Sequence, residues 1–129
     1  KMLEIAGERG IYDDLLLGDI TETLKELDNS FDLFICADTA IYIGDLQPLA
    51  NAVAERSASD ALFLFSTEVS DEPGYTLLHS GRYAHSNDYI SDMLKETHFE
   101  ILRRETLPLR KEKGEWLQGG FYLARYKGC

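Results

Sequence analysis

The chain has 129 residues, a formal net charge of −10 and 44% hydrophobic residues. This length suits one domain with one hydrophobic core, so we treat residues 1–129 as a single domain. The excess of acidic side chains argues against a nucleic-acid-binding surface, because phosphate binding needs clustered Lys and Arg. No apolar run approaches the ~20 residues that cross a bilayer, so we expect a soluble, cytoplasmic protein with no membrane partner.

The cysteines and histidines show neither a disulfide framework nor a metal-ligand pattern. Cys36 lies inside an apolar run and Cys129 is the last residue, which favours a reducing compartment. His79, His85 and His98 lack metal-ligand spacing with each other or with the cysteines. The sequence therefore predicts no metal site.

The first elements of the chain alternate in type. Residues 2–9 have the pattern of a helix end, and Tyr12–Leu17 carries a run of leucines that suits a short strand. Asp19 is predicted to be the N-cap of a helix, with Glu22 as the second member of a capping pair.

The middle of the chain continues this alternation. Phe31–Ala37 and Ala61–Phe65 are apolar runs typical of strands buried on both faces. Between them, apolar residues repeat with helical spacing, with Asp45 as the predicted cap and Pro48 in the first turn. A polar loop is predicted for residues 67–84.

The last elements are a helix and a hairpin. Ser86 is predicted to cap the helix, and Phe99–Leu109 and Trp116–Tyr126 to form an antiparallel pair. Strands that alternate with helices predict an α/β fold with a mostly parallel sheet and helices on both faces. Ligands bind beyond the carboxyl ends of such strands. Asp19 and Asp38 both follow predicted strand ends, so they are either site residues or cap and turn residues.

Several stretches resemble the latter part of a class I S-adenosylmethionine-dependent methyltransferase domain. MLEIAGERGIYDDLLLGDI is similar to the family's segment into its third strand and acidic turn, FDLFICADTAIYIGDL to its fourth strand and active-site loop, and ALFLFSTEV to its fifth strand. GYTLLHSGRYAHSNDYISDML, with GRYAHS at its centre, resembles a subgroup of small methyltransferases, some of which follow tetratricopeptide repeats. The resemblance implies a Rossmann-like sheet with a C-terminal antiparallel hairpin and an enzyme that methylates a small molecule.

The resemblance also implies S-adenosylmethionine as the cofactor. Asp19 matches the residue that hydrogen-bonds the adenine amino group, with the backbone N–H of Ile20 facing the ring. The segment at 38–40 matches the one that passes the methionine part of the cofactor and the methyl-transfer position. The implied cofactor-binding residues are Met2, Asp19, Ile20, Asp38, Thr39 and Ala40.

The candidate catalytic residues are His85, Tyr42 and Tyr83. His85 is the candidate general base, because histidine titrates near neutral pH; the alternative is a loop histidine that caps the following helix. Tyr42 and Tyr83 are candidates for the wall of an acceptor pocket, or they pack at the sheet edge. Glu68 is a further candidate for that pocket, and Arg82 either binds an acidic acceptor or pairs with Glu68.

The chain holds no counterpart of the family's glycine-rich turn or of the acidic end of its second strand. The resemblance therefore implies a truncated domain that lacks the first two strands, and we expect this chain itself to be inactive and to bind the cofactor weakly or not at all. The family's sheet order is 3-2-1-4-5-7-6, so Tyr12–Leu17 would lose its partner. We expect it to pair with the strand Phe31–Ala37 or with another chain, and the second outcome gives a dimer.

Two other function classes remain as alternatives to a methyltransferase. A noncatalytic Rossmann-like module for protein interaction is the main alternative. A nicotinamide-dependent dehydrogenase is disfavoured, because its G-x-G-x-x-G is absent and the closing hairpin fits it poorly.

Overall fold

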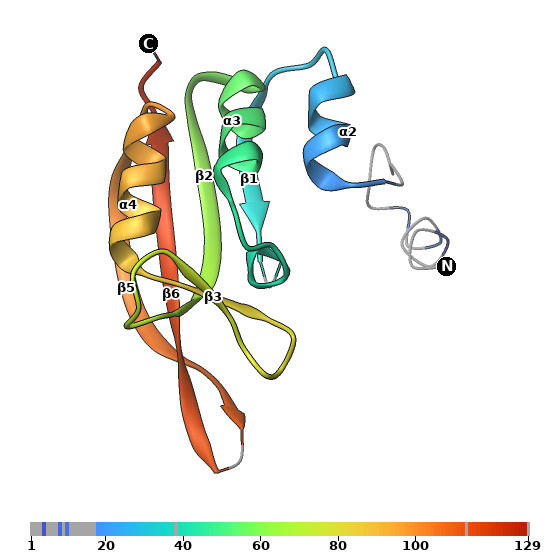
Figure 1. The fold of residues 1–129 in the computed structure, drawn as a ribbon. Coiled ribbons are helices and arrows are strands. Elements are labelled where there is room, and N and C mark those ends of the chain that lie inside the picture. The colour runs from blue at the N-terminus through green and yellow to red at the C-terminus, as the bar shows by residue number, and fades with distance from the viewer. Residues whose placement is uncertain are drawn as a thin grey trace.

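The computed structural model describes residues 18–37, 39–112 and 114–128, together with positions 4, 8 and 10. The predicted strand Tyr12–Leu17 and the candidate residues Met2 and Asp38 lie outside the described residues. In chain order the elements are α2 (Ile20–Glu26), β1 (Phe31–Cys36), the 3-10 turn η1 (Ala40–Tyr42), α3 (Gln47–Glu55), β2 (Ser57–Val69), β3 (Tyr75–Leu77), β4 (Tyr83–His85), α4 (Asn87–Glu96), β5 (Phe99–Glu112) and β6 (Glu115–Tyr126) (Figure 1).

The strands form one 6-stranded sheet of mixed direction. β1 and β4 run parallel to β2, whereas β6 is antiparallel to β2, β5 to β6 and β3 to β4. The neighbours β1-β2-β6-β5 reproduce the 4-5-7-6 part of the implied order, and the closing hairpin is confirmed. The prediction of a mostly parallel sheet is wrong, because the supposed loop at 67–84 holds the end of β2, all of β3 and the start of β4, and β3 adds an antiparallel pair with β4.

The helices α3 and α4 cover one face of the sheet (Figure 1). Their buried residues share a core with side chains of β1, β2, β5 and β6 and of the loop before α3; the members are Cys36, Ala40, Leu46, Leu49, Ala50, Val53, Phe63, Phe65, Ile90, Met93, Leu94, Phe99, Tyr122 and Ala124. The opposite face carries Leu33, Ile35 and Leu64, which are 52%, 63% and 39% exposed. Helices on both faces were therefore wrongly predicted for the described part of the chain.

Two of the predicted helix caps are confirmed by hydrogen bonds. Asp19 Oδ2 accepts the N–H of Glu22 at 3.1 Å, and Ser86 Oγ accepts the N–H of Tyr89 at 3.1 Å. The prediction for α3 is one residue early, because Leu46 is the N-cap. Asp45 instead accepts the N–H of Gln47 at 3.1 Å and shapes the turn that precedes the helix.

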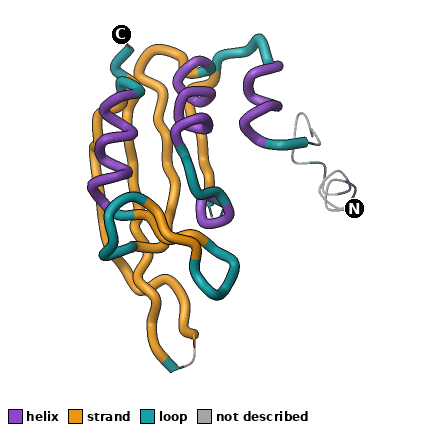
Figure 2. The backbone as a smooth tube through the Cα atoms, viewed as in Figure 1, coloured by secondary structure: helices purple, strands orange, loops and turns teal. Residues whose placement is uncertain are grey.

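β2 is longer than predicted, and this extension creates the site region. β1 ends at the pair Cys36–Phe65, while β2 continues and pairs with β4 at Glu68 and Val69. Since β6 occupies the other side of β2, β4 takes the position that β1 leaves vacant. The end of β5, from Pro108 to Glu112, and the start of β6, from Glu115 to Gln118, pair only with each other and form a two-stranded ribbon that leaves the sheet (Figure 2).

No helix in the described part of the chain is long and apolar enough to cross a membrane.

Candidate functional site

The candidate site lies where β1 ends and β2 continues beside β4. The loop from residue 39 to 46, which contains η1, packs against this junction and buries Ala40 and Ile41 almost completely. The β3–β4 hairpin lies next to it (Figure 2). Segments far apart in the sequence are thus brought together at the carboxyl ends of the parallel strands, where ligands bind in α/β sheets.

His85 connects the hairpin to this loop. Its Nε2 lies 2.9 Å from the carbonyl oxygen of Gly44, and because a carbonyl only accepts, Nε2 carries the proton. Nδ1 is buried and has no hydrogen-bond partner among the described residues. Burial lowers the pKa of His85, although the carbonyls of Gly44 and Ile43 partly oppose this shift. The ring is therefore neutral at pH 7.

Aromatic rings surround His85 and form what we call the aromatic clamp: Tyr75, Tyr83, His85 and Tyr89. The ring centroids of Tyr75 and Tyr89 lie 6.0 and 5.8 Å from that of His85, and Tyr75 packs edge-on against Tyr83 at 6.0 Å. Such edge-on aromatic pairs contribute about 0.5–1.5 kcal/mol beyond burial. The clamp fixes the loop to β3, β4 and α4.

Gly44 is the residue of the loop that packs between the rings of Tyr75 and Tyr83. A Cβ at this position would lie 2.8 Å from Tyr83 Cε1 and 2.9 Å from Tyr75 Cε2. Only a residue without a side chain fits between these rings. Gly44 is thus required for packing. Because it has no side chain, the loop can lie close to the rings, and the Gly44 carbonyl can reach His85.

The hydroxyl of Tyr89 fixes the end of the loop. It donates to Asp45 Oδ1 at 2.9 Å and accepts the N–H of Leu46 at 2.8 Å. Burial, with the nearby Asp45 carboxylate, raises the pKa of Tyr89 to about 12, while the Leu46 N–H opposes the shift. The phenol therefore stays protonated at neutral pH and serves as a hydrogen-bonding link.

A buried ion pair lies on the other side of the junction. Arg82 Nε donates to Glu68 Oε2 at 2.7 Å, and the two side chains are 12% and 3% exposed. Glu68 Oε1 has no hydrogen-bond partner in the described part of the chain. Of the two roles considered for Arg82, the structure shows the pairing with Glu68.

Two open hollows flank the junction. One of about 340 Å³ includes Glu68, Thr76 and Ala84, which lie side by side on neighbouring strands. The other, of about 530 Å³, lies between the chain at 70–74 and the start of α4. Its acidic side chains are Asp71, Glu72, Asp88 and Asp92. These charges disfavour an anionic ligand there.

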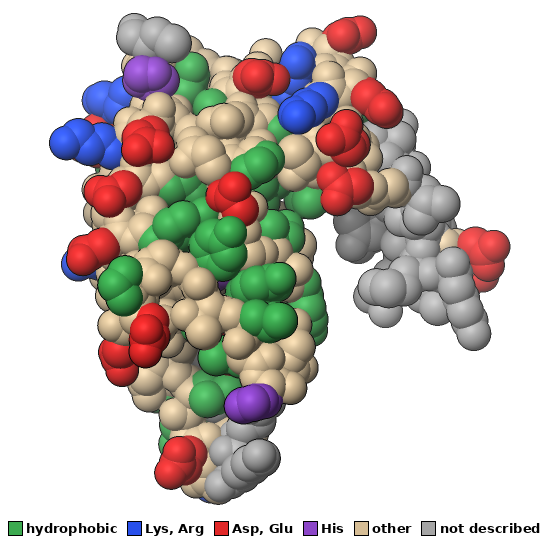
Figure 3. Space-filling model, in the orientation of Figure 1, with side chains coloured by type: hydrophobic (Ala, Val, Ile, Leu, Met, Phe, Trp, Pro, Cys, Tyr) green, Lys and Arg blue, Asp and Glu red, His purple; other side chains and the backbone are tan. Residues whose placement is uncertain are grey.

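Exposed aromatic and apolar side chains gather over the same region. Tyr42 is 64%, Tyr75 43% and Leu77 61% exposed. Figure 3 shows hydrophobic side chains over the loop and the hairpin, with acidic side chains around them. Among the described residues, no three His, Cys, Asp or Glu side chains are placed to hold a metal ion.

The described cofactor candidates lie on the loop and at the start of α2. Asp19 is exposed and caps α2, and Ile20 lines an apolar groove between α2 and β1 that also reaches Cys36. Thr39 Oγ1 donates to the Ala37 carbonyl at 3.0 Å, and Ala40 is buried. The groove therefore brings one adenine-side candidate near the end of β1.

Among the catalytic candidates, Tyr83 and His85 come together in the clamp. Tyr42 lies at the end of η1 with its ring exposed, and no described contact joins it to the clamp. Sequence reasoning missed Gly44, Tyr75 and Tyr89. The one available signal was the glycine before Asp45 in YIGD, because a glycine between apolar and polar segments often marks close packing.

No model of a known protein family and no curated protein matches this sequence. Solved structures do match. A methyltransferase from Methanosarcina mazei described as S-adenosylmethionine-dependent has a TM-score of 0.71 at 13% identity, over 96% of this chain and 76% of that one. One from Clostridium acetobutylicum has a TM-score of 0.70 at 17% identity, over 97% and 69%. The [4+2]-cyclase SpnF has a TM-score of 0.76 at 15% identity, over 95% and 60%. The chain has the fold of the S-adenosylmethionine-dependent methyltransferases.

Proposed function

We propose that this chain is the latter part of a methyltransferase domain that uses S-adenosylmethionine to methylate a small molecule. The observation that carries the proposal is the fold likeness over 95–97% of the chain, with TM-scores of 0.70–0.76. The sheet neighbours β1-β2-β6-β5 agree with the order that the sequence resemblance implies. Fold alone does not fix chemistry, as the cyclase among these structures illustrates, so the site residues supply the rest.

The cofactor side of the proposed site is the start of α2 and the end of β1. The exposed Asp19 carboxylate uses Oδ2 to cap α2, and a carboxylate has capacity for further donors such as an adenine amino group. Ile20 offers an apolar contact to the ring. Thr39 and Ala40 follow the strand end and would pass the methionine part. Met2 and Asp38, which lie outside the described residues, are included as cofactor-binding residues on the basis of the sequence resemblance alone.

The acceptor side is the loop and the aromatic clamp. Tyr42 offers an exposed ring beside the proposed cofactor segment, and Tyr83 packs the wall of the loop. His85 has the chemistry of a base because its Nδ1 lone pair is unprotonated, but in this arrangement it is fully buried and first of all positions Gly44. An acceptor would reach Nδ1 only after the hairpin moves aside.

The substrate class follows from charge. When bound, the cofactor supplies an electrophilic methyl group, and the protein's main task is to position the acceptor in line with it. The acidic side chains of the 530 Å³ hollow favour a neutral or cationic small molecule over an anionic one. We assign the GRYAHS stretch, in which Tyr83–His85 form β4 and Ser86 caps α4, to this acceptor side.

The test is calorimetric binding of S-adenosylhomocysteine to a longer polypeptide that includes the segment encoded before Lys1. We expect binding by the longer polypeptide, and weak or no binding by the 129-residue chain. Asp19→Ser keeps the α2 cap but removes the carboxylate, so it should weaken binding roughly tenfold or more. Asp28→Ser in the exposed turn after α2 is the matched control. Absence of binding by a folded longer polypeptide would rule the proposal out.

A noncatalytic interaction module is the second candidate. It is favoured by the exposed Leu33 and Ile35 on the helix-free face and by the buried position of His85. The segment before Lys1 separates the two functions: a glycine-rich turn followed by an acidic strand end supports the enzyme, and their loss supports the module.

A further inference from the structure

The β3–β4 hairpin is joined to the sheet by a short stretch of main-chain pairing. β4 pairs with β2 at two positions, Glu68–Ala84 and Val69–His85. Among the described strands β3 pairs with β4 alone, and its Leu77 is 61% exposed. Elements with few main-chain pairs and much exposed surface open locally at a lower free energy than core strands do. The hairpin therefore depends on its side chains to stay closed.

His85 is the side chain that connects the closed hairpin to the loop at 39–46. It is fully buried, and its Nε2 donates to the Gly44 carbonyl at 2.9 Å. Nδ1 has no hydrogen-bond partner in the described part of the chain. A proton on Nδ1 would thus be a buried charge without an acceptor, and such a charge is costly. The closed hairpin therefore favours the neutral ring.

The elements around His85 do not supply the missing acceptor. Their titratable and charged groups are Tyr75 of β3, Tyr83 of β4, Tyr89 of α4, Asp45 of the loop, Glu68 of β2 and Arg82 of the turn between β3 and β4. The Asp45 carboxylate accepts the Tyr89 hydroxyl at 2.9 Å. The Glu68 carboxylate accepts from Arg82 Nε at 2.7 Å. Both carboxylates are thus bound to other donors, and the ring of His85 is left among tyrosines.

We propose that the β3–β4 hairpin is a pH-sensitive gate, in which protonation of His85 at Nδ1 favours an open state where β4 leaves β2 and the imidazole reaches solvent. In the open state water hydrates the imidazolium, so the ring titrates near its ordinary pKa of about 6.5. In the closed state burial lowers the pKa. The open state therefore binds the proton first as pH falls, and its population rises below about pH 6.5.

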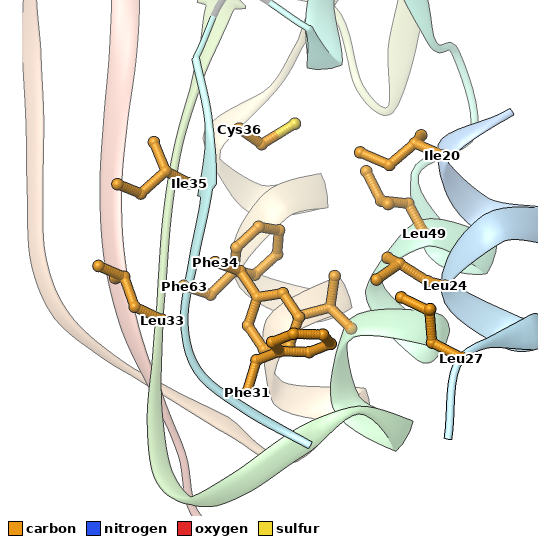
Figure 4. Close-up of a pocket in the computed structure, with 11 residues that line it drawn as sticks. Ile20, Leu24, Leu27, Phe31, Leu33, Phe34, Ile35, Cys36, Leu49 and Phe63 are labelled. Atoms are coloured by element: carbon orange, nitrogen blue, oxygen red, sulfur yellow. The ribbon is translucent and has the colours of Figure 1, made fainter. Parts of the chain in front are cut away.

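The gate would control access to the acceptor side of the site. Thr76 and Ala84 of the hairpin line the 340 Å³ hollow, and Gly74 and Ser86 at its ends line the 530 Å³ hollow. Opening would widen both and give an acceptor access to the loop. The groove between α2 and β1 (Figure 4), which Ile20 lines on the proposed cofactor side, contains no residue of the hairpin. This role rests on the proposed function, whereas the gate itself does not.

Native-state hydrogen exchange of the 129-residue chain at a series of pH values tests the gate. The reporters are the amides of Tyr83–His85 and of Ser70, which donates to the His85 carbonyl at 3.1 Å. At about pH 7.5 we expect them to exchange roughly tenfold or more faster than the β6 amides beside β2. Their exchange should not depend on low concentrations of urea, because opening exposes little surface. Between about pH 7.5 and 5.5 their protection factors should fall roughly tenfold.

Two histidine variants assign this fall to one residue. His85→Gln keeps a donor for the Gly44 carbonyl but does not titrate, so the dependence of protection on pH should disappear. His79→Gln, at an exposed position in the turn of the same hairpin, is the matched control and should retain the dependence.

Three results would overturn the proposal. One is exchange of the reporters with the same rate and urea dependence as the β6 amides, because the hairpin would then open only when the whole chain unfolds. Another is protection of the reporters that does not change between these pH values. The third is a fall that persists in His85→Gln. The wild-type measurements decide even if His85→Gln does not fold. None of them involves the cofactor, so their failure would leave the proposed function untouched.

Discussion

Burial changes the role of His85 from a candidate base to a structural residue. Its Nε2 is committed to the Gly44 carbonyl, and no other described polar group satisfies Nδ1. Protonation of Nδ1 would place a charge among aromatic rings, which is why burial lowers its pKa. The residue that the sequence offers as a base is thus, in this conformation, a neutral link between β4 and the loop.

This lowered pKa predicts a pH dependence of stability. His85 titrates near 6.5 in the unfolded chain and lower in the folded one, so the unfolded state binds the proton first as pH falls. The free energy of unfolding should be maintained above pH 6.5 and decrease below it. Urea unfolding at a series of pH values measures this. His85→Gln, which keeps a donor for Gly44, should flatten the decrease, whereas His79→Gln should not.

Gly44→Ala tests the packing of the clamp. The new Cβ would lie 2.8–2.9 Å from the Tyr83 and Tyr75 rings, so we expect a loss of about 1–3 kcal/mol in the free energy of unfolding. Gly44 has no positive φ, so its loss of stability would come from the contacts of the new Cβ. Gly81→Ala is the comparison: a Cβ there meets open space while φ is +88°, so this variant measures backbone strain without a steric clash. Gly44→Ala as stable as the wild type would show that the clamp is loose in solution.

At the scale of elements, the sequence predicted what local chemistry determines. Asp19 and Ser86 were identified as caps because each precedes an apolar helical pattern. A side-chain oxygen at that position accepts a hydrogen bond from a free N–H group of the first turn. The hairpin followed from two strand patterns around a short turn. These features depend on neighbours in the sequence, so they are readable without tertiary contacts.

What the sequence did not predict depends on tertiary contacts. β3 and β4 are three residues each, in a polar segment, and exist because the extended end of β2 provides a partner. Gly44 and Tyr89 act across some 40 residues of sequence separation, through His85 and Asp45. No spacing rule connects such positions. The sequence therefore pointed to Tyr83 and His85 as individual candidates, but it could not predict that they pack together in the clamp.

Ser86→Ala tests the cap of α4. The Ser86 hydroxyl accepts the Tyr89 N–H, and loss of such a cap costs about 1 kcal/mol of unfolding free energy. Because Tyr89 also holds the loop, local exchange of the Asp45 and Leu46 amides should increase as well. Ser86→Asn, which retains a capping oxygen, should remain within a few tenths of a kcal/mol of the wild type. Equal destabilisation by Ala and Asn would contradict a capping role.

At the scale of the whole molecule, the described helices cover one face of the sheet and leave its other face open. The buried residues of α3 and α4 share one core with Phe63 and Phe65. The other face presents Leu33, Ile35 and Leu64, an apolar surface of the kind that mediates association. This asymmetry is not visible in the sequence, because an apolar run alone predicts burial on both faces.

The asymmetry predicts that the same substitution affects stability very differently at two isoleucines. Ile35→Thr, on the open face, should change the free energy of unfolding by less than about 0.5 kcal/mol and reduce self-association in sedimentation velocity. Ile90→Thr, at a fully buried position in α4, should cost about 2 kcal/mol or more, because it removes apolar contact and buries a hydroxyl. Urea unfolding of both variants gives the comparison. If Ile35→Thr is as destabilising as Ile90→Thr, then the second face is covered in solution, and the sheet is buried on both sides as the apolar strands alone suggest.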